Sequence, residues 1–105
     1  MSGRASRRKG DRIEREIVTL HRELGIPAER VPLSGAAGGS FNGDVVIHLE
    51  PPLRAEVKAR GDGAGFVTLE RWLGQRDALF LRRNHAEPLV VVPWSTWRRL
   101  LGKPA

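Results

Sequence analysis

The sequence predicts one α/β domain, a mixed five-stranded sheet flanked by helices in the order α-β-β-β-α-β-β-α. Near the N-terminus, apolar residues recur at helical spacing, and further along they fall into short extended runs. Additional helical segments interrupt and follow these runs, which favours a sheet covered by helices. A chain of 105 residues, 40% of them hydrophobic, can bury one core but not two. We therefore expect a single domain over residues 10–105.

The first nine residues are basic and polar. They contain no acidic residue and four cationic ones: Arg4, Arg7, Arg8 and Lys9. A segment of this composition lacks the apolar side chains that packing against a core requires. We expect a flexible basic arm over residues 1–9 that contacts DNA phosphates, the alternative being a solvated tail without a ligand.

A helix is predicted over residues 11–24. Its apolar residues are spaced by 4, 3 and 4 positions, as on one helical face: Ile13, Ile17, Leu20 and Leu24. Asp11 is a favourable N-cap, Gly25 stands where a glycine commonly ends a helix, and Pro27 prevents continuation.

The later elements are expected from apolar runs between turn residues. Strands are expected over residues 29–33, 44–49, 54–59, 78–82 and 89–92, and helices over 68–75 and 95–101. Two glycine-rich segments, 34–43 and 60–65, contain little that could join a core and are expected to be loops. Pro93 ends the last strand, and Ser95 caps the last helix.

Composition restricts the classes of function. Eighteen Lys and Arg against twelve Asp and Glu give a formal charge of +6 and a pI near 11.2, which favours nucleic acid as the partner. The absence of cysteine excludes disulfides and cysteine-ligated zinc. No apolar run approaches the ~20 residues of a membrane span. We expect a cytoplasmic, DNA-associated protein with no membrane partner and no small-molecule cofactor.

Charged and small apolar residues alternate over residues 54–59. Glu56 and Lys58 are two positions apart and so share one face of a strand, and Asp44 opens the preceding strand. Two carboxylates can hold a hard cation such as Mg²⁺, while a lysine can orient a water and offset charge on a phosphate. This pattern favours phosphodiester hydrolysis, although Glu and Lys also alternate on strands that are merely solvated.

Four segments then occur in a recognisable order: RKGDRIEREIV at 8–18, ERVPLSG at 29–35, GDVVI at 43–47 and AEVKAR at 55–60. Their sequence and intervals resemble the archaeal-type Holliday junction resolvases, which are PD-(D/E)xK, or restriction-endonuclease-like, nucleases. The chain departs from the family pattern in having Gly43 where a proline usually precedes the aspartate. The resemblance implies a restriction-endonuclease-like fold.

The resemblance also implies a site, residue by residue. The catalytic residues expected are Glu14, Ser34, Asp44, Glu56 and Lys58, of which Glu14, Asp44 and Glu56 hold Mg²⁺, with Mn²⁺ as a substitute. The DNA-binding residues expected, the basic arm included, are Arg4, Arg7, Arg8, Lys9, Arg15, Arg30 and Arg60. For Glu14 an alternative exists, because Asp11 and Glu14 have the spacing of a capping box.

The function expected is metal-dependent resolution of four-way DNA junctions by paired phosphodiester hydrolysis. Two symmetric nicks require two sites related by a two-fold axis, so we expect a homodimer. The interface residues expected are Trp72, Leu73, Phe80 and Leu81. The alternatives are another PD-(D/E)xK nuclease (nicking, end-processing or restriction-like) and a non-catalytic DNA-binding protein.

Overall fold

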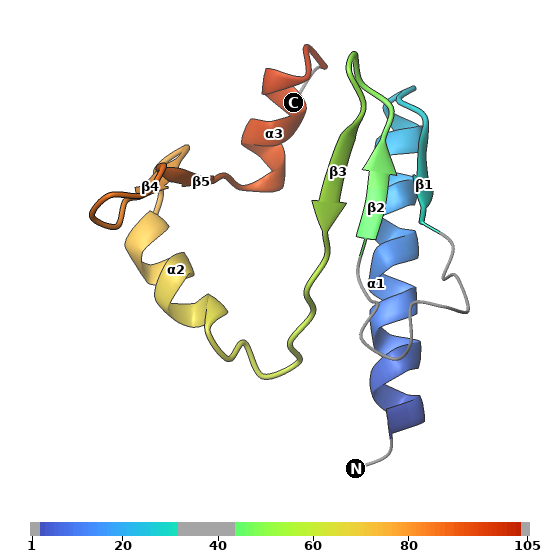
Figure 1. Cartoon of the computed structure of the whole chain (residues 1–105), viewed down its shortest axis with the longest axis horizontal. Coiled ribbons are helices and arrows are strands. Elements are labelled where there is room, and N and C mark those ends of the chain that lie inside the picture. The colour runs from blue at the N-terminus through green and yellow to red at the C-terminus, as the bar shows by residue number, and fades with distance from the viewer. Residues whose placement is uncertain (1–2, 32–43, 104–105) are drawn as a thin grey trace. The chain divides into compact units, whose positions relative to one another are not determined.

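A computed structural model of the chain describes residues 3–31 and 44–103, the side chains of residues 3–9 and 44 excepted. The described chain forms two compact units, Met1–Ala59 and Arg60–Ala105. The first contains one helix and three strands, and the second contains two helices and two strands (Figure 1). All eight predicted elements occur in the predicted order, which confirms the α/β class.

Helix α1 spans Gly3–Glu23 and begins eight residues before the predicted start. Five of residues 3–9 are Arg, Lys or Ala, which are good helix formers, and this explains why the helix extends over them. The flexibility of this segment stays a prediction. Asp11 therefore lies inside the helix, and the capping box with Glu14 is wrong. The predicted end is confirmed, because Gly25 has φ of +82° and follows the last turn. In the described part of the chain, no helix is both long and apolar enough to span a membrane.

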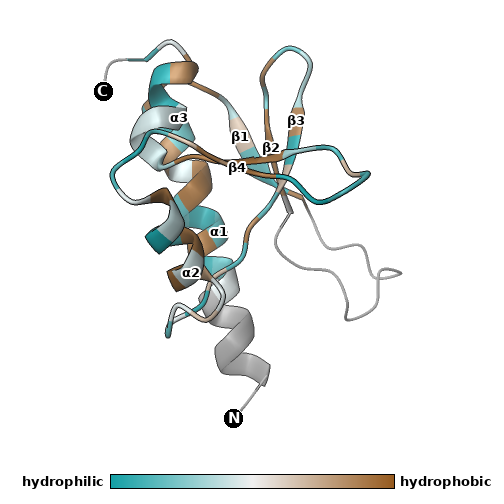
Figure 2. Ribbon diagram, turned by 90° about the vertical axis from the view of Figure 1, so that its left-hand side faces the viewer, coloured by the Kyte–Doolittle hydropathy of each residue, from teal (hydrophilic) through white to brown (hydrophobic). Residues whose placement is uncertain are grey.

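The first unit contains an antiparallel sheet of β1 (Ala28–Arg30), β2 (Asp44–Ile47) and β3 (Leu53–Glu56), in that order. The amphipathic α1 lies against β1 and β2 (Figures 1 and 2). The core between them consists of Val18, Ile26, Ala28, Val45 and Ile47. His21 is also buried there, and its Nδ1 forms a hydrogen bond of 2.8 Å with the carbonyl oxygen of Ile17, which satisfies that nitrogen within the core.

The second unit consists of α2 (Phe66–Leu73), β4 (Leu79–Leu81), β5 (Leu89–Val91) and α3 (Trp94–Leu100). Strands β4 and β5 pair as an antiparallel hairpin, with Phe80 opposite Val90. Large apolar side chains remain exposed on this unit: Val67, Trp72, Phe80, Leu89, Val90 and Leu100. Exposed apolar side chains in this number are typical of a surface that is covered by another part of a protein or by a partner.

The predicted single mixed sheet differs from what the structure shows. The five strands form two antiparallel sheets, one in each unit. Strands that follow one another along the chain pair locally, β2 with β3 and β4 with β5, because a short connection suffices for an antiparallel pair. Strands β3 and β4 are joined by a segment that contains α2 and is long enough for a parallel crossover, but they are not paired with each other. The single domain over residues 10–105 stays a prediction.

Candidate active site

Strands β2 and β3 bring the two predicted strand carboxylates to the same level. Their register places Asp44 directly opposite Glu56, at the end of the hairpin away from its 48–52 connection. Asp44 is the first residue of β2, and Glu56 is the last residue of β3. Two carboxylate residues twelve positions apart in the sequence are thus opposite each other across one pair of strands.

Glu56 and Lys58 form an exposed ion pair beside this position. Lys58 Nζ lies 3.5 Å from Glu56 Oε1, and the side chains are 57% and 54% exposed, respectively. Ala55 and Val57, which alternate with them, are half-buried. Exposed ion pairs contribute only ~0–1 kcal/mol to stability, so this pair does little to hold the fold. Both groups are open to a ligand.

Glu14 is a residue of α1, and its side chain is directed to β1. Its side chain is 7% exposed, and its Oε1 accepts a hydrogen bond of 2.9 Å from Nε of Arg30 on β1. Nη2 of Arg30 donates to Oδ1 of Asp11 at 2.7 Å. Arg30 is opposite Val45 on β2, so the cluster of Asp11, Glu14 and Arg30 lies on the face of the sheet to which Val45 is directed.

The structure brings some predicted residues together and leaves others apart or outside its description. Ser34 lies outside the described residues, and so do the side chains of Arg4, Arg7, Arg8, Lys9 and Asp44. Arg15 and Arg60 are described and exposed. Arg30 is engaged with two carboxylates. Sequence reasoning missed that Asp11 pairs with Arg30. Asp11 and Glu14 are three positions apart on one helical face, and this spacing indicated that they could share a partner.

Carboxylate oxygens are the ligands that Mg²⁺ prefers, and the pairing of Asp44 with Glu56 suits that chemistry. Among the side chains that the structure describes, no three of His, Cys, Asp or Glu form a group that could hold a metal ion. The side chain of Asp44 does not belong to the described side chains. The two strand carboxylates are thus of the chemical type that such a cation prefers.

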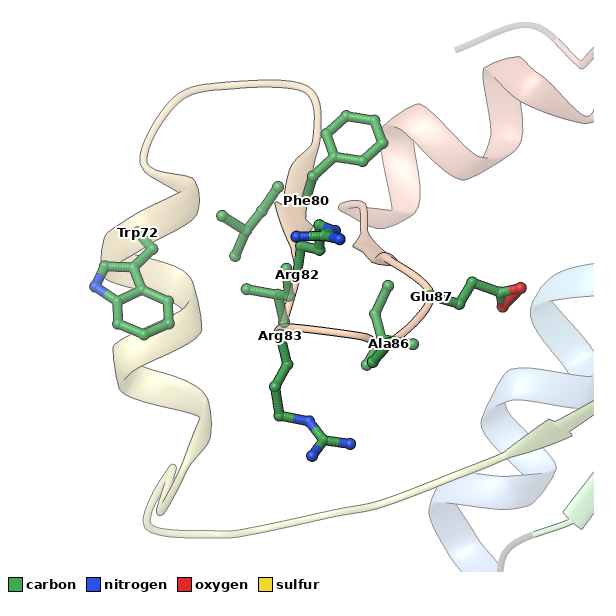
Figure 3. A pocket seen from close by; sticks show the side chains of 9 residues that line it. Trp72, Phe80, Arg82, Arg83, Ala86 and Glu87 are labelled. Atoms are coloured by element: carbon green, nitrogen blue, oxygen red, sulfur yellow. The ribbon is translucent and has the colours of Figure 1, made fainter.

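The second unit contains a hollow of about 670 Å³. It is lined by Trp72 of α2, by the β4 hairpin and by the turn that follows (Figure 3): Leu79, Phe80, Leu81, Arg82, Arg83, Ala86, Glu87 and Leu89. Three of the four predicted interface residues line it, namely Trp72, Phe80 and Leu81. Its wall combines apolar side chains with two arginines.

The fold and this carboxylate–lysine arrangement are compatible with a DNA-cleaving enzyme, and the comparison with protein families is specific on this point. The family described as archaeal Holliday junction resolvase (Hjc) matches residues 5–99. The chain belongs to this family. Membership implies a resolvase-type nuclease that acts on branched DNA. No curated protein matches the chain, and no solved structure matches it.

Proposed function

We propose that the protein is a Mg²⁺-dependent endodeoxyribonuclease that resolves four-way DNA junctions as a homodimer. The observation that carries the proposal is the register of β2 and β3, which sets Asp44 opposite Glu56, with Lys58 two residues further on. Residues directly opposite in an antiparallel pair share one face of the sheet, with Cβ atoms about 4.5–5.5 Å apart. That spacing suits two ligands of one cation.

The residues that would hold the cation are Asp44 and Glu56; the family resemblance adds Glu14, whose side chain is buried and bound to Arg30. A bound divalent cation supplies Lewis-acid chemistry, polarising the scissile phosphate and activating water for in-line attack. Lys58 keeps its ammonium 3.5 Å from Glu56. From there it can donate a hydrogen bond to the attacking water or to a phosphate oxygen, and its charge offsets the negative charge that develops during attack.

Binding of DNA is assigned to the basic residues. Arg15, Arg60 and the cationic residues 4–9 of α1 would contact backbone phosphates, and a guanidinium with five donors lets Arg30 do so while it is held by carboxylates. Phosphate contacts do not read base sequence, so recognition would follow the shape of the junction.

The proposal is tested by comparing four-way junction, linear duplex and flap DNA in Mg²⁺, in Mn²⁺ and in EDTA. We expect paired, symmetric nicks in the junction with either cation and none in EDTA. Equal cleavage of duplex or flap DNA would instead indicate another PD-(D/E)xK nuclease. Junction binding without cleavage in either cation would indicate a non-catalytic DNA-binding protein.

The homodimer is proposed from the exposed apolar face of the second unit. Phe80 and Val90 are opposite each other on β4 and β5 and are 69% and 55% exposed. Trp72 of α2 is 53% exposed. Burying such side chains against a second copy would remove apolar surface from water, which favours association. A dimer would also supply the second active site that two nicks require.

Phe80→Glu is expected to shift the protein from dimer to monomer, because a carboxylate would be buried against apolar side chains. Size-exclusion chromatography with light scattering measures the change. Gln75→Glu, at an exposed position after α2, introduces the same charge and should leave the dimer intact. A Phe80→Glu protein that remained dimeric would place the interface elsewhere.

A further inference from the structure

The three-stranded sheet of the first unit has a core face, against which α1 packs, and an outer face. Val45 and Ile47 of β2 are 0% and 3% exposed and belong to the core. On β3, Ala55 is opposite Val45 and therefore shares the core face. Arg54 and Glu56 alternate with Ala55, so they belong to the outer face, and both are exposed.

Cationic residues stand on both sides of Glu56 in this row. Lys58 follows Glu56 by two positions and pairs with it at 3.5 Å. Arg54 precedes Glu56 by two positions, on the side toward the 48–52 connection. Residues two positions apart on an antiparallel strand are separated by about 6.8 Å. This length is similar to the spacing of neighbouring phosphates along a DNA strand, so a phosphate chain could follow the row.

The register does not account for Arg54 as the partner of an opposing acid. The residue opposite Arg54 on β2 is Val46, which is itself opposite Glu29 on β1. Arg54 takes part in an interaction within the chain. A guanidinium has five N–H donors in a planar fork that suits phosphate oxygens, so it can bind a phosphate while it keeps a contact within the chain.

We propose that Arg54 is a substrate-binding residue, which donates to the phosphate next to the scissile one on the strand that is cut. This inference rests on the proposed function, in which Asp44 and Glu56 hold the cation that polarises the scissile phosphate. The cut strand then runs along the outer face of β3, past Lys58, Glu56 and Arg54 in that order.

The test is single-turnover cleavage of a four-way junction in Mg²⁺ at increasing protein concentration, repeated at several NaCl concentrations. For Arg54→Gln we expect a half-saturating concentration roughly tenfold higher, because a charge-assisted hydrogen bond to phosphate is lost. This concentration should also depend less steeply on NaCl, since fewer phosphates are neutralised. The maximal rate should change much less, because the contact with the neighbouring phosphate is present both before and during the attack.

Two further variants make the inference specific, and thermal melting verifies that each variant is folded. Arg54→Lys keeps the charge and should recover most of the dependence on NaCl. Arg22→Gln removes the same charge from an exposed residue of α1 and should match the wild type in half-saturating concentration.

Three results would overturn the inference. The first is a wild-type half-saturating concentration for Arg54→Gln, and the second is a loss confined to its maximal rate, because in neither case would Arg54 contribute to binding. The third is an equal effect of Arg22→Gln, because net charge alone would then explain the loss. A wild-type chain that cleaves no junction in Mg²⁺ or Mn²⁺ would instead overturn the proposed function.

Discussion

Glu56→Gln is expected to lower the rate of junction cleavage by roughly a thousandfold, because loss of one ligand carboxylate removes several kcal/mol of cation-dependent stabilisation of the transition state. Glutamine has nearly the same shape and keeps one oxygen, so the β2–β3 pair should be undisturbed. Glu56 is 54% exposed and contributes little to the core. Binding of the junction should persist, since it depends on the cationic side chains.

Single-turnover cleavage of a four-way junction in Mg²⁺ measures this effect, and gel retardation in EDTA measures binding. Asp44→Asn should show the same separation of cleavage from binding, because Asp44 is opposite Glu56. The matched control is Glu50→Gln, an exposed glutamate in the connection between β2 and β3 that undergoes the same change of charge. If Glu56→Gln cleaved at nearly the wild-type rate, the assignment of the site to this strand pair would be wrong.

The elements that sequence reasoning located are those set by local patterns. Residues 44–47 form a strand because Val45 and Ile47 alternate with residues of the other face and are buried. Gly25 ends α1 because it adopts a positive φ without a steric penalty. The alternation of Ala55, Glu56, Val57 and Lys58 likewise predicted which side chains are exposed. Each of these features depends on neighbours only a few residues away.

The features that sequence reasoning missed depend on partners far along the chain. Asp11 has the local features of an N-cap residue, yet its carboxylate accepts from Arg30, nineteen positions away, once β1 lies against α1. The early start of α1 had a different cause, because the cationic residues before Asp11 indicated a DNA-binding arm and also favour a helix. The division into two sheets depends on which strands meet, and apolar patterning alone does not determine that.

Arg30→Met is expected to destabilise the first unit by about 2–3 kcal/mol. Removing one partner of a buried ion pair costs about 3–5 kcal/mol, because the remaining charge is buried without compensation. Arg30 is 33% exposed and Asp11 is 46% exposed, so solvent screens part of the interaction and the lower value applies. Urea denaturation at neutral pH measures the loss as a shift of the midpoint at constant slope.

The control for this change is Arg22→Met. Arg22 is an exposed residue of α1 whose Nε donates to the carbonyl oxygen of Ala28 at 2.9 Å, so its loss removes the same charge and one hydrogen bond, at about 1 kcal/mol. Adding Glu14→Gln to Arg30→Met should recover much of the stability, because the buried carboxylate is then replaced by a neutral amide. If Arg30→Met were no more destabilising than Arg22→Met, Glu14 would not depend on Arg30 for its charge. The ion pairs of Arg30 with Asp11 and Glu14 would then contribute little to the packing of α1 against β1.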